Sequence, residues 1–207
     1  MNTWLIASII YISIAVITFI PTLKAIIKKV KLYPGGASFD ESSYFSEEAK
    51  KSLIQHYSRL QGTLLFWKNE ASKYTRFHFY CLWWTIPSAT LIPTVTQLID
   101  GTPYSKLFLT IVSTHTAMLL SFYKGFKIES NLKAFRHGES EFYDLYRRLL
   151  DRPLSFGDTE AKQLESYFYE VELIRKYVRN AETDNFPFLS EEVRLSLENK
   201  KSGSGSN

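Results

Sequence analysis

The stretch FYCLWWTIPSATLIPTVTQLI, Phe79–Ile99, contains no charged residue, yet it carries two prolines and several hydroxyl side chains. Its length matches the ~20 residues that a helix needs to cross a bilayer. A buried helix of a soluble protein is the alternative, but Pro87 and Pro93 count against it, because each removes an internal helix hydrogen bond. In a membrane, neighbouring helices, hydroxyl groups or water satisfy the freed backbone groups. We therefore interpret the stretch as a helix in lipid that is kinked at Pro87 and Pro93.

Two further apolar runs have lengths suited to a bilayer, WLIASIIYISIAVITFIPTL (Trp4–Leu23) and LFLTIVSTHTAMLLSFY (Leu107–Tyr123). A cleaved signal peptide is the alternative for the first run, but no basic residue precedes it and no small-x-small cleavage site follows it. The basic residues come after it, as in a membrane anchor whose N-terminus lies outside. Together with residues 77–99, where His78 is taken as neutral, the chain has three predicted spans.

Basic residues flank these three spans unevenly. Lys and Arg are enriched in the cytoplasmic loops of membrane proteins. One side of the three-span arrangement carries Lys106 alone, and the other carries Lys24, Lys28, Lys29, Lys31, Lys68, Lys73, Arg76, Lys124, Lys127, Lys133 and Arg136. The connection DGTPYSK (Asp100–Lys106) supplies Gly and Pro for a tight turn. We therefore predict a first span with its N-terminus outside, followed by an outward-pointing transmembrane hairpin.

The rest of the chain has the pattern of long amphipathic helices. After Ser46, a predicted N-cap, apolar residues recur in alternating steps of four and three, as in a heptad seam: Leu53, Tyr57, Leu60, Leu64, Trp67, Ala71 and Tyr74. A second stripe continues inward from the third span, interrupted near residues 137–139 and ended by Pro153: Ile128, Leu132, Phe135, Phe142, Tyr146 and Leu149. A third helix, starting near Ser155 or Asp158, carries Leu164, Phe168, Val171, Ile174 and Val178. Matching seams predict an antiparallel bundle.

The predicted fold class is all-α, an integral membrane protein with an N-terminal span, a transmembrane helical hairpin and a cytoplasmic helical bundle. Its parts are an anchor with a basic flank (1–31), a cytoplasmic helix (44–76), the transmembrane hairpin (77–123), a cytoplasmic helical hairpin (124–182) and a C-terminal tail (183–207). Within the tail, the residues after Pro187 are predicted to add a short docking helix capped by Ser190.

The sequence offers little support for catalysis. HGESE (His137–Glu141) places two metal-type side chains on one helix face, and two ligands are too few for a zinc site. The PGG at Pro34 lacks the Gly-Lys-Ser/Thr ending of a phosphate loop. Cys81 is the single cysteine, whereas a zinc deaminase needs a second one. We expect no enzyme activity, no metal site and no cofactor, and a net charge of +4 is too small to indicate nucleic-acid binding by itself.

Polar side chains inside the predicted hairpin form the first candidate site. They are Thr110, Ser113, Thr114, His115, Ser121, Thr90, Thr94 and Gln97. Two interpretations stay open: packing between helices through small and hydroxyl side chains, or a wetted path lined by hydroxyls. In both, the polar faces are expected to face one another rather than lipid. His115 is a candidate for pore lining or gating, because ionisable groups at this depth face a protein interior or a cavity. Such a path requires a homo-oligomer.

Basic residues form the second candidate set, for contact with lipid headgroups or with a regulatory partner. They are Lys24, Lys28, Lys29, Lys31, Lys124, Lys127, Lys133 and Arg136. Basic clusters beside membrane spans are attracted to anionic lipids. A partner that contains nucleic acid would instead bind with an affinity that falls steeply with salt.

Three segments carry a resemblance to a known family: FWKNEASKYTRFHFY (Phe66–Tyr80), the hairpin 81–123 and LKAFRHGESEFYDLYRRLL (Leu132–Leu150). From Leu53 to Val178 the chain resembles the SLATT-like two-transmembrane effectors of bacterial anti-phage systems, which pair a membrane hairpin with long cytoplasmic helices. The residues that match the family's post-hairpin helix are Phe135, Arg136, Glu141, Phe142 and Tyr146. With its extra N-terminal span, the chain is most similar to the membrane effectors encoded beside retron reverse transcriptases.

The resemblance implies an abortive-infection toxin that oligomerises and disrupts the bacterial inner membrane. Its release would come from an inhibitory partner, a reverse transcriptase with its msDNA. Two alternatives stay open. One is a pore-forming effector opened by a cyclic nucleotide, and the other is a non-conducting membrane scaffold with a coiled-coil docking bundle.

Overall fold

The computed structural model describes residues 2–28, 30–32 and 38–185, and every regular element within these ranges is a helix. The elements are α1 (Thr3–Ile27), η1 (Phe39–Glu41), α2 (Glu47–Leu98), α3 (Pro103–Gly125), α4 (Ile128–Asp151), η2 (Pro153–Ser155) and α5 (Glu160–Asn185). The predicted all-α class is confirmed for this part of the chain. Lys29, the PGG at Pro34 and the predicted docking helix after Pro187 lie outside the described residues.

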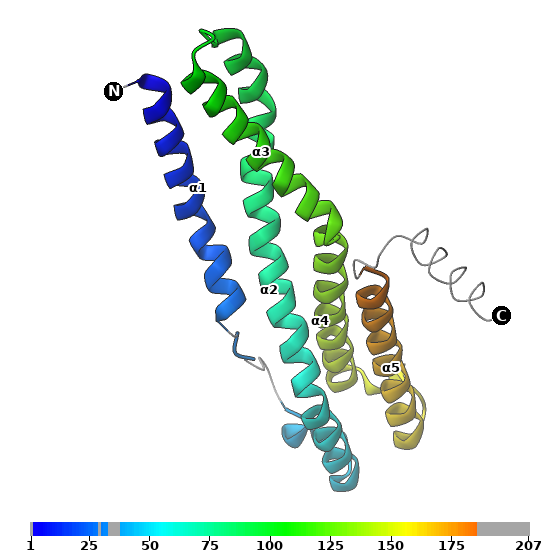
Figure 1. Ribbon diagram of the computed structural model, residues 1–207. Helices are drawn as coiled ribbons and strands as arrows, with labels where there is room; N and C mark the ends of the chain where they lie inside the picture. Colours follow the sequence, from blue (N-terminus) through cyan, green and yellow to red (C-terminus); the bar gives the residue numbers. More distant parts are fainter. Residues whose placement is uncertain (1, 29, 33–37, 186–207) are drawn as a thin grey trace, which may run out of the picture.

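Helix α2 is the longest described helix and forms the spine of the molecule, in that the other long helices lie alongside it or alongside its neighbours (Figure 1). It begins at the predicted cap, since the Ser46 hydroxyl accepts a hydrogen bond from the Ala49 N–H at 3.3 Å. Glu47 and Glu48 occupy its first turn, where the helix dipole favours negative charge. The helix runs for 52 residues and continues through both Pro87 and Pro93.

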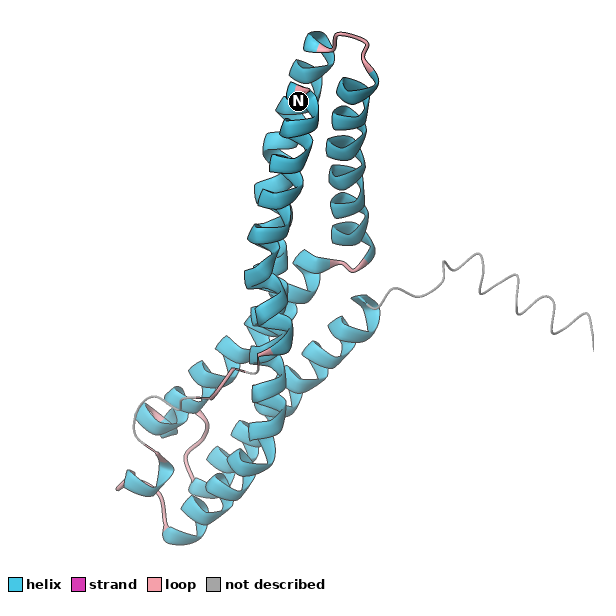
Figure 2. Cartoon of the chain, turned by 60° about the vertical axis from the view of Figure 1, so that its left-hand side comes forward, coloured by secondary structure: helices cyan, strands magenta, loops and turns pink. Residues whose placement is uncertain are grey.

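The other helices divide between the two ends of α2 (Figures 1 and 2). Helices α1 and α3 pack along its C-terminal part, and we call residues 2–28 and 77–125 the apolar half. Helix α4 packs along its N-terminal part and α5 packs on α4, and we call residues 38–76 and 128–185 the polar half. In the polar half α4 runs antiparallel to both α2 and α5, so the predicted helical bundle is confirmed.

The polar half has a continuous core made mainly of the predicted seams. Its buried members are Phe39, Phe45, Ala49, Leu53, Leu60, Leu64, Trp67, Ala71, Phe135, Phe142, Leu145, Leu149, Phe156, Tyr167, Val171 and Val178. Phe39 and Phe45 come from the connection before α2, where the sequence pattern predicted no core residue. The Phe39 ring packs 4.5 Å from the Tyr146 ring, centroid to centroid. The connection therefore closes the lower end of the bundle.

Two predicted helix limits differ from the structure. The third span was expected to continue inward, but the helix breaks at Phe126 and Lys127. The interruption of the apolar stripe near residues 137–139 lies within the continuous helix α4. Lys127 adopts a left-handed backbone with φ of 43°, which ends α3 and starts α4. Gly138 is buried in the contact between α4 and α5. A Cβ at this position would lie only 2.4 Å from Val178 Cγ2, so the glycine permits close packing of the two helices.

Helix α5 starts later than predicted. Ser155 belongs to the 3-10 turn η2, and α5 begins at Glu160 after Thr159, whose hydroxyl accepts a bond from the Lys162 N–H. Gly157 has φ of 154°, a backbone value that favours glycine. The capping-box spacing of residues 155–158 is therefore used as a turn instead of a helix start.

Two described helices, α1 and α3, are long and apolar enough to cross a membrane. The third predicted span, the C-terminal part of α2, does not reach the same mean hydropathy. Helix α1 is also poorly covered by the other described residues. Its large apolar side chains that are exposed are Ile9, Ile10, Ile12, Ile14, Val16, Ile17, Ile20, Leu23, Ile26 and Ile27. Exposure of this extent distinguishes α1 from the core helix of a soluble domain.

Candidate functional site

The three helices of the apolar half meet at His115. Its Nδ1 lies 2.9 Å from the Tyr11 hydroxyl of α1, and its Nε2 lies 3.4 Å from the Tyr80 hydroxyl of α2. The Trp84 ring packs edge-on against the imidazole, with 5.3 Å between centroids. The Tyr80 hydroxyl also donates to the Ala15 carbonyl at 3.3 Å. His115 therefore joins α3 to both neighbouring helices.

A neutral imidazole suits this surrounding chemically. It has one N–H donor and one acceptor nitrogen, and a phenol hydroxyl pairs with either. Both ring nitrogens thus have partners without an ionic charge, which matters where few other polar groups are available. In a single chain this arrangement is a helix-to-helix joint. The expected pore-lining role of His115 stays a prediction about an assembly of several copies.

Two further hydrogen bonds hold α1 against α2. The Trp84 indole N–H donates to the Thr18 hydroxyl at 3.0 Å, and the Thr22 hydroxyl donates to the Arg76 carbonyl at 3.4 Å. The sequence pattern predicted no role for Thr18 or Thr22, because their partners lie more than 50 residues away. The sequence signal that could have identified Thr18 and Thr22 is the row of hydroxyl side chains on one face of α1.

Most of the candidate hydroxyls do not lie between the helices of one chain. Thr110, Thr114 and Ser121 are exposed, on the face of α3 opposite to its buried side chains at 3.6 residues per turn. Thr90, Thr94 and Gln97 are exposed on α2, whereas Ser113 is half-buried. Thr110, Thr90 and Thr94 donate to their own helix backbone at 2.8–3.0 Å. Within the described part of one chain these polar faces therefore do not meet each other, and their meeting between copies stays a prediction.

Other polar side chains lie in the interior of the apolar half. Ser88, Ser105 and Thr116 are buried, and the Thr116 hydroxyl donates to the Val112 carbonyl at 2.8 Å. Small residues at helix contacts allow close backbone approach in membranes. Packing through small hydroxyl residues therefore occurs within the chain, but at Ser88, Ser105 and Thr116 instead of at the predicted hydroxyl residues.

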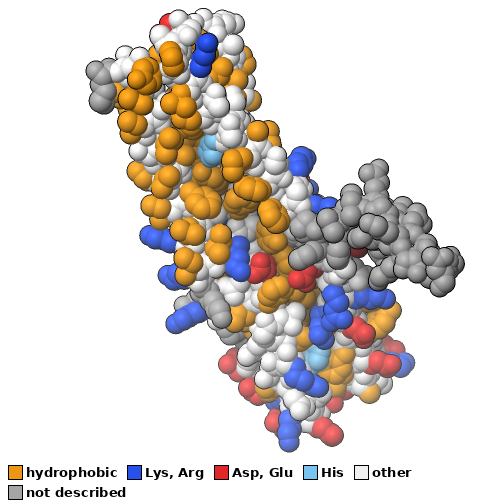
Figure 3. Space-filling view, in the orientation of Figure 1, with side chains coloured by type: hydrophobic (Ala, Val, Ile, Leu, Met, Phe, Trp, Pro, Cys, Tyr) orange, Lys and Arg blue, Asp and Glu red, His pale blue; other side chains and the backbone are white. Residues whose placement is uncertain are grey.

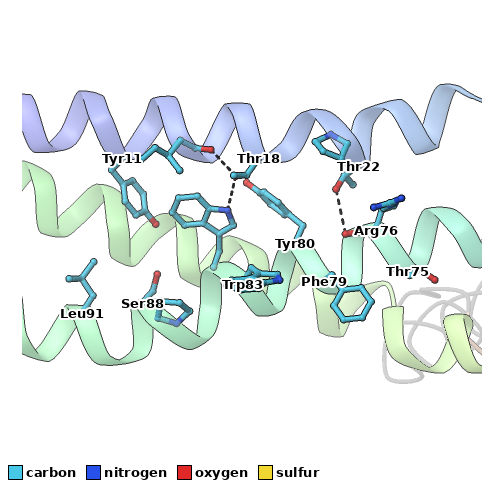
Figure 4. A pocket seen from close by; sticks show the side chains of 14 residues that line it. Tyr11, Thr18, Thr22, Thr75, Arg76, Phe79, Tyr80, Trp83, Ser88 and Leu91 are labelled. Carbon is cyan, nitrogen blue, oxygen red and sulfur yellow. Dashed lines mark hydrogen bonds between the residues drawn. The ribbon is translucent and has the colours of Figure 1, made fainter.

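An apolar groove of about 960 Å³ lies between α1 and α2 (Figure 4). Tyr11 and Thr18 approach it from α1, and Phe79, Trp83 and Leu91 line it from α2. Trp83 is 76 % exposed, the largest exposed fraction among the large hydrophobic side chains of the described chain. The predicted kink residue Pro87 lines the same groove, and Pro93 is exposed elsewhere on α2.

A basic pocket of about 690 Å³ adjoins one end of this groove, because Pro21 and Arg76 line both. Its cationic residues are Lys24, Lys28, Lys31 and Arg76. The connection after α1 is fixed there by the Val30 N–H, which donates to Asn69 Oδ1 at 2.5 Å. In Figure 3, basic side chains follow the lower edge of the hydrophobic surface, and mixed charges cover the polar half below.

The remaining basic candidates lie at the start of α4 and the end of α3. Lys127 Nζ donates to the Asp184 carbonyl at 2.6 Å, and Lys133 Nζ pairs with Glu129 at 2.6 Å. Lys124 and Arg136 are exposed. Lys127 and Lys133 therefore have polar partners within the chain. Among the described residues, the cations of the pocket between α1 and α2 form no ion pair.

Comparison with known proteins finds no matching family model, no similar curated protein and no similar solved structure.

Proposed function

We propose that the chain is a multi-pass protein of the bacterial inner membrane, with its N-terminus outside and its polar half in the cytoplasm. The exposed apolar surface of α1 carries this proposal. Apolar surface costs about 25 cal/mol per Å² in water, so ten exposed Ile, Val and Leu side chains on one helix are stable only in lipid or in an interface. Helix α3 has the required length as well.

The orientation follows from the basic residues at the junction of the two halves. Lys24, Lys28 and Lys31 lie at one end of the apolar half, and Lys106 lies near the other, beside the α2–α3 turn. Cytoplasmic loops carry the excess of Lys and Arg. The same orientation puts residues 77–98 of α2 across the bilayer, where its prolines and hydroxyls are covered in part by α1 and α3.

Within this membrane arrangement, we propose a toxic effector of a bacterial anti-phage abortive-infection system. The support is the resemblance of segments 66–80, 81–123 and 132–150 to SLATT-like effectors, and the polar half is the part to which a regulator would bind. The regulator would be a reverse transcriptase with its msDNA. Release from it would allow oligomerisation and membrane disruption.

The outward hydroxyl rows support the oligomeric part of the proposal. Thr110, Thr114 and Ser121 form a row on α3 that no helix in the described part of the chain covers. Hydroxyl rows on membrane helices are common contact surfaces between helices. A second copy packed on this row would bring hydroxyls to a shared interface, either for packing or around a wetted path.

Induced expression of the chain alone in bacteria tests the effector function. We expect rapid depolarisation, read with a membrane-potential dye, followed by loss of viability. His115→Ala should weaken the effect at equal expression because it removes the joint between three helices, and the matched control His137→Ala, on the exposed face of α4, should not. Normal growth with an intact potential, in cells where the chain is membrane-inserted, would contradict a toxin that acts without a ligand and would leave two options, a scaffold or an effector that needs an activating ligand.

A further inference from the structure

The groove between α1 and α2 and the basic pocket at its end form one continuous amphipathic surface. They share Pro21 and Arg76 as lining residues. Figure 4 shows Arg76 at one end of the apolar groove, with its guanidinium extended toward α1, and Tyr11 and Leu91 near the other end. The apolar part therefore lies in the bilayer, if the proposed membrane arrangement holds, and the cationic part lies at its cytoplasmic surface.

We propose that this surface is a binding site for one anionic phospholipid. The phosphate headgroup contacts Lys24, Lys28, Lys31 and Arg76, and the acyl chains lie in the groove against Phe79, Trp83 and Leu91. The proposal rests on the membrane placement given above and goes beyond it, because it names a selective site instead of general contact with lipid.

Charge complementarity supports an anionic occupant. The four cations line one pocket, and no acidic side chain lines either the pocket or the groove in the described part of the chain. The ion pairs among the described residues do not involve these four cations. Basic pockets between membrane helices on the cytoplasmic side bind anionic headgroups, and phosphate oxygens are the acceptors that Arg and Lys pair with best.

The dimensions of the groove support a lipid instead of a small soluble anion. Its volume of about 960 Å³ is at the upper end of small-molecule pockets. It follows α2 from Arg76 to Leu91, about 22 Å at 1.5 Å rise per residue. One leaflet contributes about 15 Å of the hydrocarbon core. The acyl chains of a lipid held at Arg76 therefore fit within the length of the groove.

The walls of the groove are held in place before any lipid binds. The Trp84–Thr18 and Thr22–Arg76 hydrogen bonds fix α1 against α2 at two levels, and the Val30–Asn69 bond fixes the segment that carries Lys31. A preformed site binds with a smaller ordering cost than one that must be assembled. Trp83 and Trp84 both line the groove, so their fluorescence reports its occupancy.

Fluorescence quenching by brominated phosphatidylglycerol tests the proposal on the full chain reconstituted in phosphatidylethanolamine vesicles. In the wild type, quenching should saturate at a low mole fraction of the brominated lipid, and Trp83→Phe should reduce its amplitude. The triple variant Lys24→Gln, Lys28→Gln, Lys31→Gln should lower the apparent affinity at least about tenfold, since each cation near the surface attracts anionic lipid. The Lys→Arg version of the same triple variant should keep the affinity.

A second triple variant is the matched control. Lys124→Gln, Lys127→Gln and Lys133→Gln remove the same charge at the same end of the apolar half, but away from the groove, and should leave the quenching curve unchanged. Quenching in the wild type that only follows the bulk fraction of brominated lipid would overturn the site, as would equal losses in the two triple variants. Crosslinking of Trp83→Cys chains into dimers, insensitive to phosphatidylglycerol, would assign the groove to a second copy.

Resistance to carbonate extraction separates this inference from the proposed function. A chain that is not extracted but shows no selective quenching retains its membrane placement and loses the lipid site. A chain released by carbonate loses both.

Discussion

Helix α2 belongs to both halves of the molecule, and its buried face changes composition between them. In the polar half it buries Leu53, Leu60, Leu64 and Trp67, while in the apolar half it buries Cys81, Ser88 and Val95. Its exposed side chains change in the opposite sense, from Lys51 and Arg59 to Phe79, Trp83 and Ile86. The heptad seam nevertheless continues along the same face of the helix.

Under the proposed membrane placement, one helix packs against its neighbours in two different solvents. In water, large apolar side chains are buried because their removal from solvent drives packing. In lipid that driving force is absent between helices, and small residues, hydroxyls and interhelical hydrogen bonds hold the contact instead. The His115 joint with Tyr11 and Tyr80 belongs to the second kind. The core around Phe142 and Tyr167 belongs to the first.

The largest expected difference between the halves concerns loss of apolar volume. Phe142→Ala removes a side chain that is 1 % exposed and should lower the free energy of unfolding by about 3–5 kcal/mol. Ile17→Ala, at a side chain of α1 that is 62 % exposed, should change it by less than about 0.5 kcal/mol. Thermal unfolding of both variants in detergent, followed by circular dichroism, measures the contrast. Equal losses would mean that α1 is buried in a stable interface.

A charge introduced into α1 should have a larger effect than the same charge introduced into the polar half. Ile17→Lys places a charge near the centre of α1, at a cost of about 2.5–3.5 kcal/mol for membrane insertion. The chain should then shift out of the carbonate-resistant membrane fraction. Leu173→Lys is the matched change on the exposed face of α5 and should leave the fraction as in the wild type. Release of both variants, or of neither, would remove the distinction between the two solvents.

Two glycines of the polar half test how much close packing between its helices contributes to stability. Gly138→Ala should destabilise by about 1–3 kcal/mol, because the new Cβ lies 2.4 Å from Val178 Cγ2 and 3.3 Å from the Trp67 ring. Gly62→Ala meets nothing within 4 Å and should stabilise by up to about 1 kcal/mol, since alanine favours helix. Unfolding midpoints of the two variants give the comparison. Adding Val178→Ala should reduce the effect of Gly138→Ala, and independence of the two changes would argue against the contact.

The last expected effect is a pH dependence that arises in the polar half. Burial lowers the pKa of His56 to about 4, with the nearby charges of Arg59 and Arg175 adding to the effect. The unfolded chain binds this proton below about pH 6.5, while the folded chain binds it only near pH 4. Stability from this group is therefore present above pH 6.5 and is lost as pH falls toward 4.

The His56 effect is isolated by substitution. With each curve referenced to its value at pH 7.5, the unfolding midpoint of the wild type should fall below that of His56→Gln as pH decreases through this window. His137→Gln on the exposed face of α4 serves as the control and should follow the wild type. A constant difference between wild type and His56→Gln would show that His56 titrates alike in both states.

Much of the polar half is predictable from the sequence because its helices obey one rule. The α2 seam from Leu53 to Tyr74 is buried or half-buried as its heptad spacing predicts, and Ser46 caps the helix as predicted. The stripe of α5 is less well predicted, since Gln163 and Tyr167 are buried beside it. Gln163 takes a core position because its amide donates to the Gly157 carbonyl at 2.9 Å, a bond that depends on the turn before α5.

The candidate site in the apolar half could be predicted only in part. His115 was identified as an ionisable residue that faces a protein interior or a cavity, but its partners on α1 and α2 are brought together by the packing of three helices. Hydroxyl side chains that bond to their own backbone suit an exposed position in lipid and an interface equally well, so their spacing alone does not assign a direction. Burial in the structure placed Thr110 and Thr114 outward and Thr116 inward.

By itself the sequence determined the helical class, the long spine from Ser46 through Pro93, and the separation of apolar from charged segments. These follow from local spacing and capping, which depend on residues a few positions apart. Only the tertiary structure decided the joint at His115, the close approach at Gly138, and the union of the apolar groove with the basic pocket at Arg76. Each depends on side chains from different helices, whose relative rotation is fixed by packing across the whole bundle.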